Sequence, residues 1–208
     1  MVEKRPKTSE QSPPSAHPNG ENEQDRLDKQ DVLAARLRNG DRTAAEELVD
    51  AYYHQIYLFM RRLGHDEQTS EDLTQESFLN AWYHIGQLRD CKALKGWLYH
   101  IAINVSRLHW RKNKGKEAKK FERIEVAETR ESEPDRLGQA EDVERLRCAV
   151  MRLPLKLRQV IVLHYLQHLT IAEGAGAAGI RQGTFKSRLN RALKALRKQM
   201  TGKTQNQQ

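Results

Sequence analysis

An apolar stripe in the first half of the chain restricts the possible fold more than any other feature. Its members follow at steps of four, four, three and four residues, and they are Leu48, Tyr52, Ile56, Phe59 and Leu63. Apolar residues at this spacing lie on one face of an α-helix. The stripe therefore predicts a long helix that packs against other helices and ends at Gly64.

Three further helices are predicted around this one. The apolar spacing indicates a short helix over about 31–40, a helix over 69–86 and a helix over roughly 94–112. Asp41 is a suitable N-cap for the long helix, because its carboxylate can accept hydrogen bonds from the first free backbone N–H groups. No strand pattern occurs in this half, so the N-terminal part is expected to be all-α.

Composition divides the chain into two folded parts. Residues 1–28 are polar and proline-rich, residues 114–140 are dominated by charge, and residues 201–208 are polar, so we expect two disordered tails and a flexible linker. The folded parts are then 29–113 and 141–200. The predicted fold is all-α, with two small helical domains joined by the charged linker.

Several classes of protein are disfavoured by the sequence. No apolar run approaches the roughly 18 residues of a membrane span, and no secretory signal is visible, so no membrane insertion and a cytoplasmic location are expected. Cys91 and Cys148 fall in different parts, which disfavours a disulfide or a thiolate metal site. His164 and His168 could share a metal, but no third ligand follows at a suitable spacing. Without a phosphate loop or nucleophile elbow, we expect no cofactor, metal or catalytic residue.

The C-terminus is basic and free of acids. The last 35 residues contain eight Lys and Arg and no Asp or Glu, in a chain of net charge +8, which favours binding to polyanions. A stripe from Phe185 to Leu196 leaves the cations on the other faces, as in the second helix of a helix-turn-helix, whose first turn enters the major groove. The candidates for base edges and phosphates are Arg181, Gln182, Thr184, Lys186, Ser187, Arg188 and Arg191.

The predicted helix over 94–112 interleaves aromatic, amide and cationic side chains. An unpaired base that stacks on an aromatic ring gains about 1–3 kcal/mol, while cations hold the strand. The alternative for Trp97 is a place in the core, where a tryptophan of such a helix is more often found. The candidates for binding single-stranded DNA are Lys95, Trp97, Asn104, Arg107, Trp110, Arg111 and Lys112.

The predicted helix over 69–86 has a polar side that suits a protein partner. Asp72, Gln75, Glu76 and Asn80 share this side, while Leu73, Phe78 and Trp82 are available to the core. A rigid helix with carboxylates and amides suits a partner helix that carries arginine. The alternative is an ordinary solvated face.

Two segments in this order resemble the extracytoplasmic-function sigma factors of bacterial RNA polymerase. Residues 70–82 and 96–104 resemble the second conserved region of that family, and residues 153–160 and 183–189 are similar to its fourth region. The resemblance covers roughly residues 30–200, apart from the linker. It implies a factor that catalyses nothing itself but binds core polymerase, directs it to promoters and promotes DNA opening.

The resemblance also implies roles for the candidate residues. The first domain would dock on the clamp helices of the largest polymerase subunit through Asp72, Gln75, Glu76 and Asn80. Asn104 would help to form a pocket for a flipped base of the non-template strand, and the second domain would read the upstream promoter element. The expected partners are core RNA polymerase, promoter DNA and, in addition, an anti-sigma factor that no local motif identifies.

The first helix of the helix-turn-helix departs from the family pattern. Thr170 and Glu173 fit a capping box, but Gly174 stands where the family has a bulky aliphatic residue, and Gly176 adds a second glycine. Arg181 replaces the usual small hydroxyl cap of the recognition helix. Each glycine costs about 1 kcal/mol in a helix interior, so we expect a C-terminal domain that is marginal alone and is stabilised by the polymerase or DNA. On this hypothesis Gly174→Ile should raise the melting temperature.

A rival interpretation is a helix-turn-helix regulator that binds duplex DNA without polymerase. It explains the basic C-terminal part of the chain. It leaves the acidic helix over 69–86 and the aromatic and basic helix over 94–112 without a function.

Overall fold

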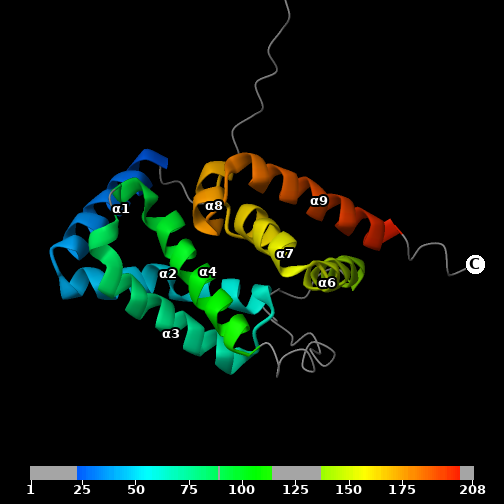
Figure 1. Ribbon diagram of the computed structural model, residues 1–208, viewed down its shortest axis with the longest axis horizontal. Helices are drawn as coiled ribbons and strands as arrows, with labels where there is room; N and C mark the ends of the chain where they lie inside the picture. Colours follow the sequence, from blue (N-terminus) through cyan, green and yellow to red (C-terminus); the bar gives the residue numbers. More distant parts are fainter. Residues whose placement is uncertain (1–22, 89, 114–136, 202–208) are drawn as a thin grey trace, which may run out of the picture.

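Two groups of helices make up the protein in a computed structural model that describes residues 23–88, 90–113 and 137–201 (Figure 1). The N-terminal unit contains α1 (Glu23–Arg38), α2 (Arg42–Leu63), α3 (Glu67–His84), the 3-10 turns η1 (Ile85–Gln87) and η2 (Cys91–Ala93), and α4 (Leu94–Lys112). The C-terminal unit contains α6 (Leu137–Met151), α7 (Leu155–Ile161), the π-helical turn η4 (Val162–Leu166), α8 (Ile171–Ala178) and α9 (Gln182–Thr201). No strand occurs in these ranges, so the predicted all-α class is confirmed.

The ends of the long helix are set by the residues that the sequence indicated. Asp41 caps α2 by accepting hydrogen bonds from the backbone N–H groups of Thr43 and Ala44. Gly64 ends the helix in the left-handed conformation at φ 105°, which glycine adopts without a steric penalty. All five stripe residues are buried. Helix α1 begins at Glu23, earlier than its apolar pattern indicated.

The apolar residues of α3 are less buried than the sequence suggested. Leu73 is buried, but Leu79 is 59% exposed and Trp82 is 37% exposed. The buried side of α3 is instead made mostly of small residues, including Ser70, Thr74, Ser77 and Ala81. The expectation that Trp82 joins the core is therefore wrong, because small side chains on the opposite side let α3 lie close to its neighbours.

The C-terminal unit contains the predicted helix-turn-helix. The capping box of α8 is complete, since Thr170 accepts a hydrogen bond from the Glu173 backbone and the Glu173 carboxylate accepts one from the Thr170 backbone. Gly179 ends α8 in the left-handed conformation. On α9, the side chains of Phe185 and Leu189 are buried.

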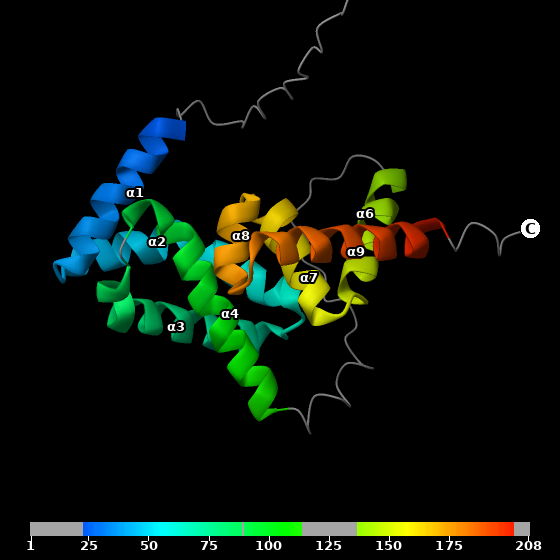
Figure 2. The ribbon, with the colours of Figure 1, turned by 45° about the horizontal axis from the view of Figure 1, so that its top comes forward.

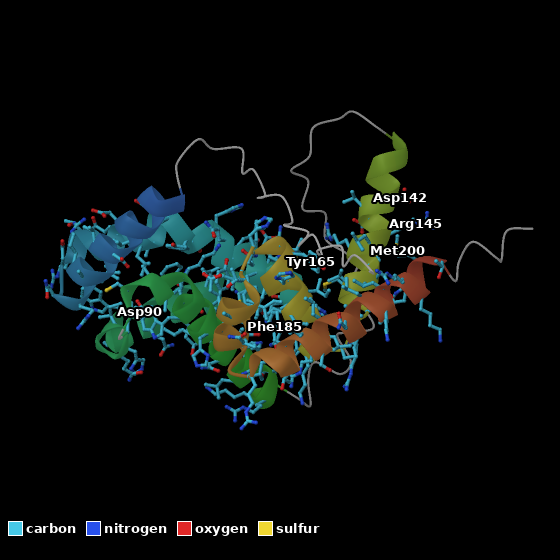
Figure 3. All side chains as sticks on the ribbon, turned by 90° about the horizontal axis from the view of Figure 1, so that it is seen from above. Asp90, Asp142, Arg145, Tyr165, Phe185 and Met200 are labelled. Atoms are coloured by element: carbon cyan, nitrogen blue, oxygen red, sulfur yellow. The ribbon has the colours of Figure 1, made fainter. Side chains whose placement is uncertain are left out.

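The space beside Gly174 is filled rather than empty. A Cβ atom at this position would lie 2.6 Å from Cζ of Phe185, whose ring is fully buried where α8 and α9 meet (Figure 3). This packing contradicts the expected gain in stability from Gly174→Ile, because the Phe185 ring already occupies the space that an aliphatic side chain at 174 would need. Gly176 differs, since a Cβ atom there would meet no atom within 4 Å.

The two units pack directly against each other. Helix α4 runs beside α8, as both ribbon views show (Figure 2). Buried Arg158 of α7 donates a hydrogen bond to the main-chain oxygen of Leu63 at the end of α2, at 2.6 Å. Burial lowers the pKa of Arg158 to about 10. A guanidinium at a helix C-terminus meets the negative end of the helix dipole, so this contact joins the units favourably.

Parts of the predicted organisation lie outside the described residues. These are residues 1–22 of the N-terminal tail, residues 114–136 of the linker and residues 202–208 of the C-terminal tail. Within the described ranges, no helix is both long enough and apolar enough to span a bilayer.

Candidate polymerase and nucleic acid interfaces

The polar surface of α3 is accessible to a protein partner. Asp72, Gln75 and Glu76 are exposed, and Asn80 is half-buried. The Asn80 amide donates to the main-chain oxygen of Glu76 at 2.8 Å, which fixes its position on the helix. We call these four residues the acidic surface of α3.

Hydrogen bonds within α3 keep the opposite side of the helix close to the core. The hydroxyl of Thr74 donates to the Ser70 oxygen, and that of Ser77 donates to the Leu73 oxygen, both at 2.6 Å. Bonding to the preceding turn lets a small hydroxyl be buried without an unpaired donor. The helix is therefore a firm support for the acidic surface.

Apolar groups adjoin the acidic surface. Leu79, Trp82 and Tyr83 are exposed by 59%, 37% and 77%. Leu79, Trp82 and Gln75 also line a groove of about 390 Å³ against α2, together with Leu48 and Tyr53. Carboxylates beside exposed aromatic and aliphatic groups are typical of a protein contact, in which apolar groups fill the centre and charges select the partner.

The candidate single-strand residues on α4 do not share one free face. Lys95 donates to the main-chain oxygen of Gln167 at 2.9 Å, and Arg107 donates to that of Ala178 at 2.9 Å. Both acceptors belong to the C-terminal unit. Asn104 is exposed and lies 3.0 Å from Nε2 of His100.

The remaining α4 candidates differ in their surroundings. Trp97 is half-buried and packs against the core, as its alternative assignment expected. The Trp110 ring lies 4.8 Å from the ring of His65. Arg111 and Lys112 are exposed in the last turn of the helix.

The candidates for duplex binding remain accessible at the start of α9. Six of the seven are exposed, namely Arg181, Gln182, Thr184, Lys186, Ser187 and Arg191. Arg188 is half-buried, and its charge acts on the guanidinium of Arg107. Burial, and then the charge of Arg188, lower the pKa of Arg107. Cations from two candidate DNA-binding surfaces thus lie near each other.

Residues outside the predicted set complete these surfaces. His100, Gly96 and Gln167 contribute to the contact between the units. Leu79 and Tyr83 add exposed apolar groups beside the acidic surface of α3. The run of glycine and alanine in α8 was the available signal for the first group, since small residues permit close approach of backbones.

The described residues contain no group of three or more His, Cys, Asp or Glu side chains that could hold a metal ion. His164 is engaged by the backbone, because its Nδ1 lies 2.8 Å from the Leu169 oxygen and must donate to it. Cys91 and Cys148 are both free thiols.

Comparison with known proteins supplies a family context for these surfaces. The family model described as Sigma-70 region 2 matches residues 34–116, and the one described as Sigma-70, region 4 matches residues 143–196. The chain is 31% identical over 175 residues to the ECF RNA polymerase sigma factor SigW of Bacillus subtilis (strain 168), which covers 79% of this chain and 93% of that protein.

Two solved structures share the fold. CnrH in complex with the cytosolic domain of CnrY matches with a TM-score of 0.62 and 21% identity, over 83% of this chain and 97% of that chain. The sigma factor RpoE from Bartonella quintana, in complex with the anti-sigma factor NepR, matches with a TM-score of 0.58 and 24% identity. This match covers 74% of the present chain and 95% of that chain. Both comparisons support the two-unit helical architecture.

Proposed function

The chain belongs to the extracytoplasmic-function sigma factors of the sigma-70 family, and on that premise we propose how its surfaces divide promoter recognition and opening. As a sigma factor, it binds core RNA polymerase and directs it to promoters. It acts with polymerase in the cytoplasm and catalyses no reaction itself.

The acidic surface of α3 is the polymerase contact in this proposal. Its accessible Asp72, Gln75, Glu76 and Asn80 would meet arginine on the clamp helices of the largest subunit, and Leu79 and Trp82 would fill the centre of that contact. This surface carries the proposal, because a regulator that binds DNA alone has no use for it.

The other two surfaces contact DNA. On α4, Asn104 would hold a flipped base, while Lys95, Arg107, Arg111 and Lys112 would hold the unpaired strand. On α9, Arg181, Gln182, Thr184, Lys186 and Ser187 would meet base edges and flanking phosphates, and Arg188 and Arg191 would meet phosphate. Trp97 and Trp110 would support the single-strand surface and stack on bases where they become accessible.

An anti-sigma factor is a further partner in this proposal. The solved relative from Bartonella quintana has such a factor bound. A protein of this kind would regulate the chain by covering the same surfaces.

The function is tested by run-off transcription from a promoter library with purified chain and core polymerase. We expect selected promoters to give transcripts that core alone does not give, and the chain to co-purify with core. Transcription no higher than with core alone, together with no co-purification, would contradict the sigma function. Duplex binding without core would then favour the stand-alone regulator.

A charge reversal tests the polymerase contact. Asp72→Arg should weaken binding to core by about tenfold or more, because it places a cation opposite the arginine expected on the partner. Glu71→Arg is the matched control, since Glu71 is exposed on the same helix outside the acidic surface and changes charge by the same amount. Equal affinities of the two variants for core, measured by fluorescence anisotropy, would show that the contact lies elsewhere.

A further inference from the structure

A groove on the N-terminal unit is lined mostly by apolar and aromatic side chains. It has a volume of about 390 Å³ and lies where α2 and α3 meet the end of α1 at Leu37. The rings of Tyr53 and Phe78 stack in its lining, with centroids 6.2 Å apart and planes inclined by 15°. Leu79 and Trp82 also line it and are exposed by 59% and 37%. The groove therefore offers three aromatic rings to a ligand.

Carboxylates flank this groove on both of its long helices. Each lies three positions before a residue that lines the groove, and residues three apart are neighbours on a helix surface. They are Glu46 and Asp50 of α2 and Asp72 and Glu76 of α3, all exposed. The groove thus suits a ligand that combines apolar groups with positive charge.

The segment that precedes α1 has a composition that fits such a groove. Residues 1–22 lie outside the described residues and contain four of the six prolines of the chain. Proline-rich segments favour the polyproline II conformation, which costs little entropy to bind and docks on grooves lined by aromatic rings. The prolines concerned are Pro6, Pro13, Pro14 and Pro18.

Chain length decides which of these prolines can reach the groove. A helix rises about 1.5 Å per residue, so Leu37 lies about 21 Å along α1 from Glu23. An extended chain spans at most about 3.6 Å per residue, so Pro14 can lie up to about 32 Å from Glu23. Pro18 can lie at most about 18 Å away, which is short of the Leu37 end. Pro13 and Pro14 are therefore the prolines that fit.

Cations precede these prolines in the chain. Lys4, Arg5 and Lys7 cluster within residues 3–7, where Glu3 is the one carboxylate. At least six residues separate this cluster from Pro13, so with the prolines on the groove the cations can extend to the carboxylates that flank it. Complementary charges at the rim of a contact fix its register and favour one partner over others.

We propose that residues 4–14 of this chain dock on the groove between α2 and α3 and compete there with core RNA polymerase. Because the segment belongs to the same chain, its effective concentration at the groove is about millimolar, so weak contacts are sufficient for partial occupancy. The acidic surface of α3 is then covered in part until polymerase displaces the segment. The competition rests on the proposed polymerase contact, whereas the docking itself does not.

Paramagnetic relaxation enhancement tests the docking in the full-length chain. A nitroxide is attached at Ser12→Cys, next to Pro13, after both native cysteines have been replaced by serine. We expect strong broadening of the indole N–H signal of Trp82, which Trp82→Phe identifies. The signal of Trp110, which lies beside His65 past the far end of α2, should broaden little. Equal broadening of the two signals would overturn the docking.

A mixed sample distinguishes this segment from that of a second copy. Spin-labelled chain without isotope enrichment is combined with ¹⁵N-enriched chain that carries no label. We expect no selective broadening of Trp82 in this mixture, because the segment binds the groove of its own chain. Broadening as strong as in the singly labelled sample would mean that the segment binds another molecule, and it would contradict the proposal.

Proline substitutions test the competition with polymerase. Pro13→Ser with Pro14→Ser should abolish the selective broadening and raise the affinity for core by at least about threefold, because a larger fraction of molecules then has a free groove. Pro18→Ser is the matched control, since it removes a proline of the same segment that is too close to α1 to reach the Leu37 end. Fluorescence anisotropy with core measures both variants. Equal affinities would overturn the competition.

The outcomes separate this proposal from the sigma function. Broadening is measured without polymerase, and core binding is measured for the unmodified chain as well. If the chain binds core and Trp82 is not selectively broadened, the proposal fails and the sigma function stands. If Trp82 is selectively broadened and the chain does not bind core, the docking stands, while the competition and the proposed function both fail.

Discussion

At the scale of single residues, the fold changes the pKa of the buried His65 side chain. The side chain is 5% exposed, and its Nε2 lies 2.8 Å from the Ser106 hydroxyl. Its ring also packs against the rings of His109 and Trp110. Burial, and then the charge of His109, lower the pKa of His65 from 6.5 to about 3. The residue therefore stays neutral in the folded protein at any pH near neutrality.

This shift makes stability depend on pH in a defined window. Between pH 6.5 and 3 the unfolded chain binds a proton at His65 and the folded chain does not, so stability is fully present above pH 6.5 and falls with acidification. The slope from this residue approaches about 1.4 kcal/mol per pH unit. His65→Gln should therefore lose less stability than the parent between pH 7 and pH 5 in urea unfolding. Parallel curves for the two proteins would show that His65 is not the group responsible.

At the scale of single elements, helix α8 combines strong ends with a small-residue interior. The capping box satisfies backbone groups at its start, and at its end the Gly179 N–H bonds to the oxygens of Ala175 and Gly176. Its interior glycines serve different purposes, since Gly174 makes room for the Phe185 ring and Gly176 faces open space. Glycine content alone predicts the same cost at both positions. The packing shows that only one of them can accept a larger side chain.

Two alanine substitutions in α8 should have opposite effects. Gly176→Ala should stabilise the protein by about 0.5–1 kcal/mol, because it lowers the backbone entropy of the unfolded chain and meets no neighbour. Gly174→Ala should destabilise it by about 1–3 kcal/mol, because the added Cβ forces a buried aromatic ring to move. Thermal unfolding of both variants measures the difference. A higher melting temperature for Gly174→Ala would mean that the Phe185 ring adapts freely.

At the scale of the whole molecule, net charge and packing have separate roles. The charge of +8 attracts any polyanion over a distance set by salt. Packing of α4 against α8 decides which cations are available, because it engages Lys95 and Arg107 and leaves the start of α9 exposed. The molecule can therefore be attracted to duplex DNA while its single-strand surface is occupied.

The salt dependence of promoter binding should distinguish the two kinds of contact on α9. With core polymerase present, Arg191→Ala should reduce the slope of log affinity against log salt by about 0.9, because one phosphate contact is lost. Gln182→Ala is the comparison, since an uncharged side chain at a base edge changes sequence preference and leaves the slope unchanged. Filter binding over a range of salt measures both. An unchanged slope for Arg191→Ala would show that Arg191 does not contact a phosphate.

Local structure and family membership follow from short-range features of the amino-acid sequence. Apolar spacing set the helices, while Asp41, Gly64 and the capping box of α8 set several of their ends, since periodicity and capping act within a few residues of the chain. The two ordered motifs were sufficient for the sigma-factor assignment, because both lie in continuous segments of the sequence.

Which candidate side chains are accessible depends on how segments far apart in the chain pack together. Arg107 and His100 find their acceptors 71 and 77 residues away in the chain, and those acceptors are main-chain oxygens. Every residue type carries the same carbonyl group, so no side chain in the sequence marks where a cation will bind. The exposure of Leu79 and Trp82 and the filled space at Gly174 likewise depend on how whole helices pack.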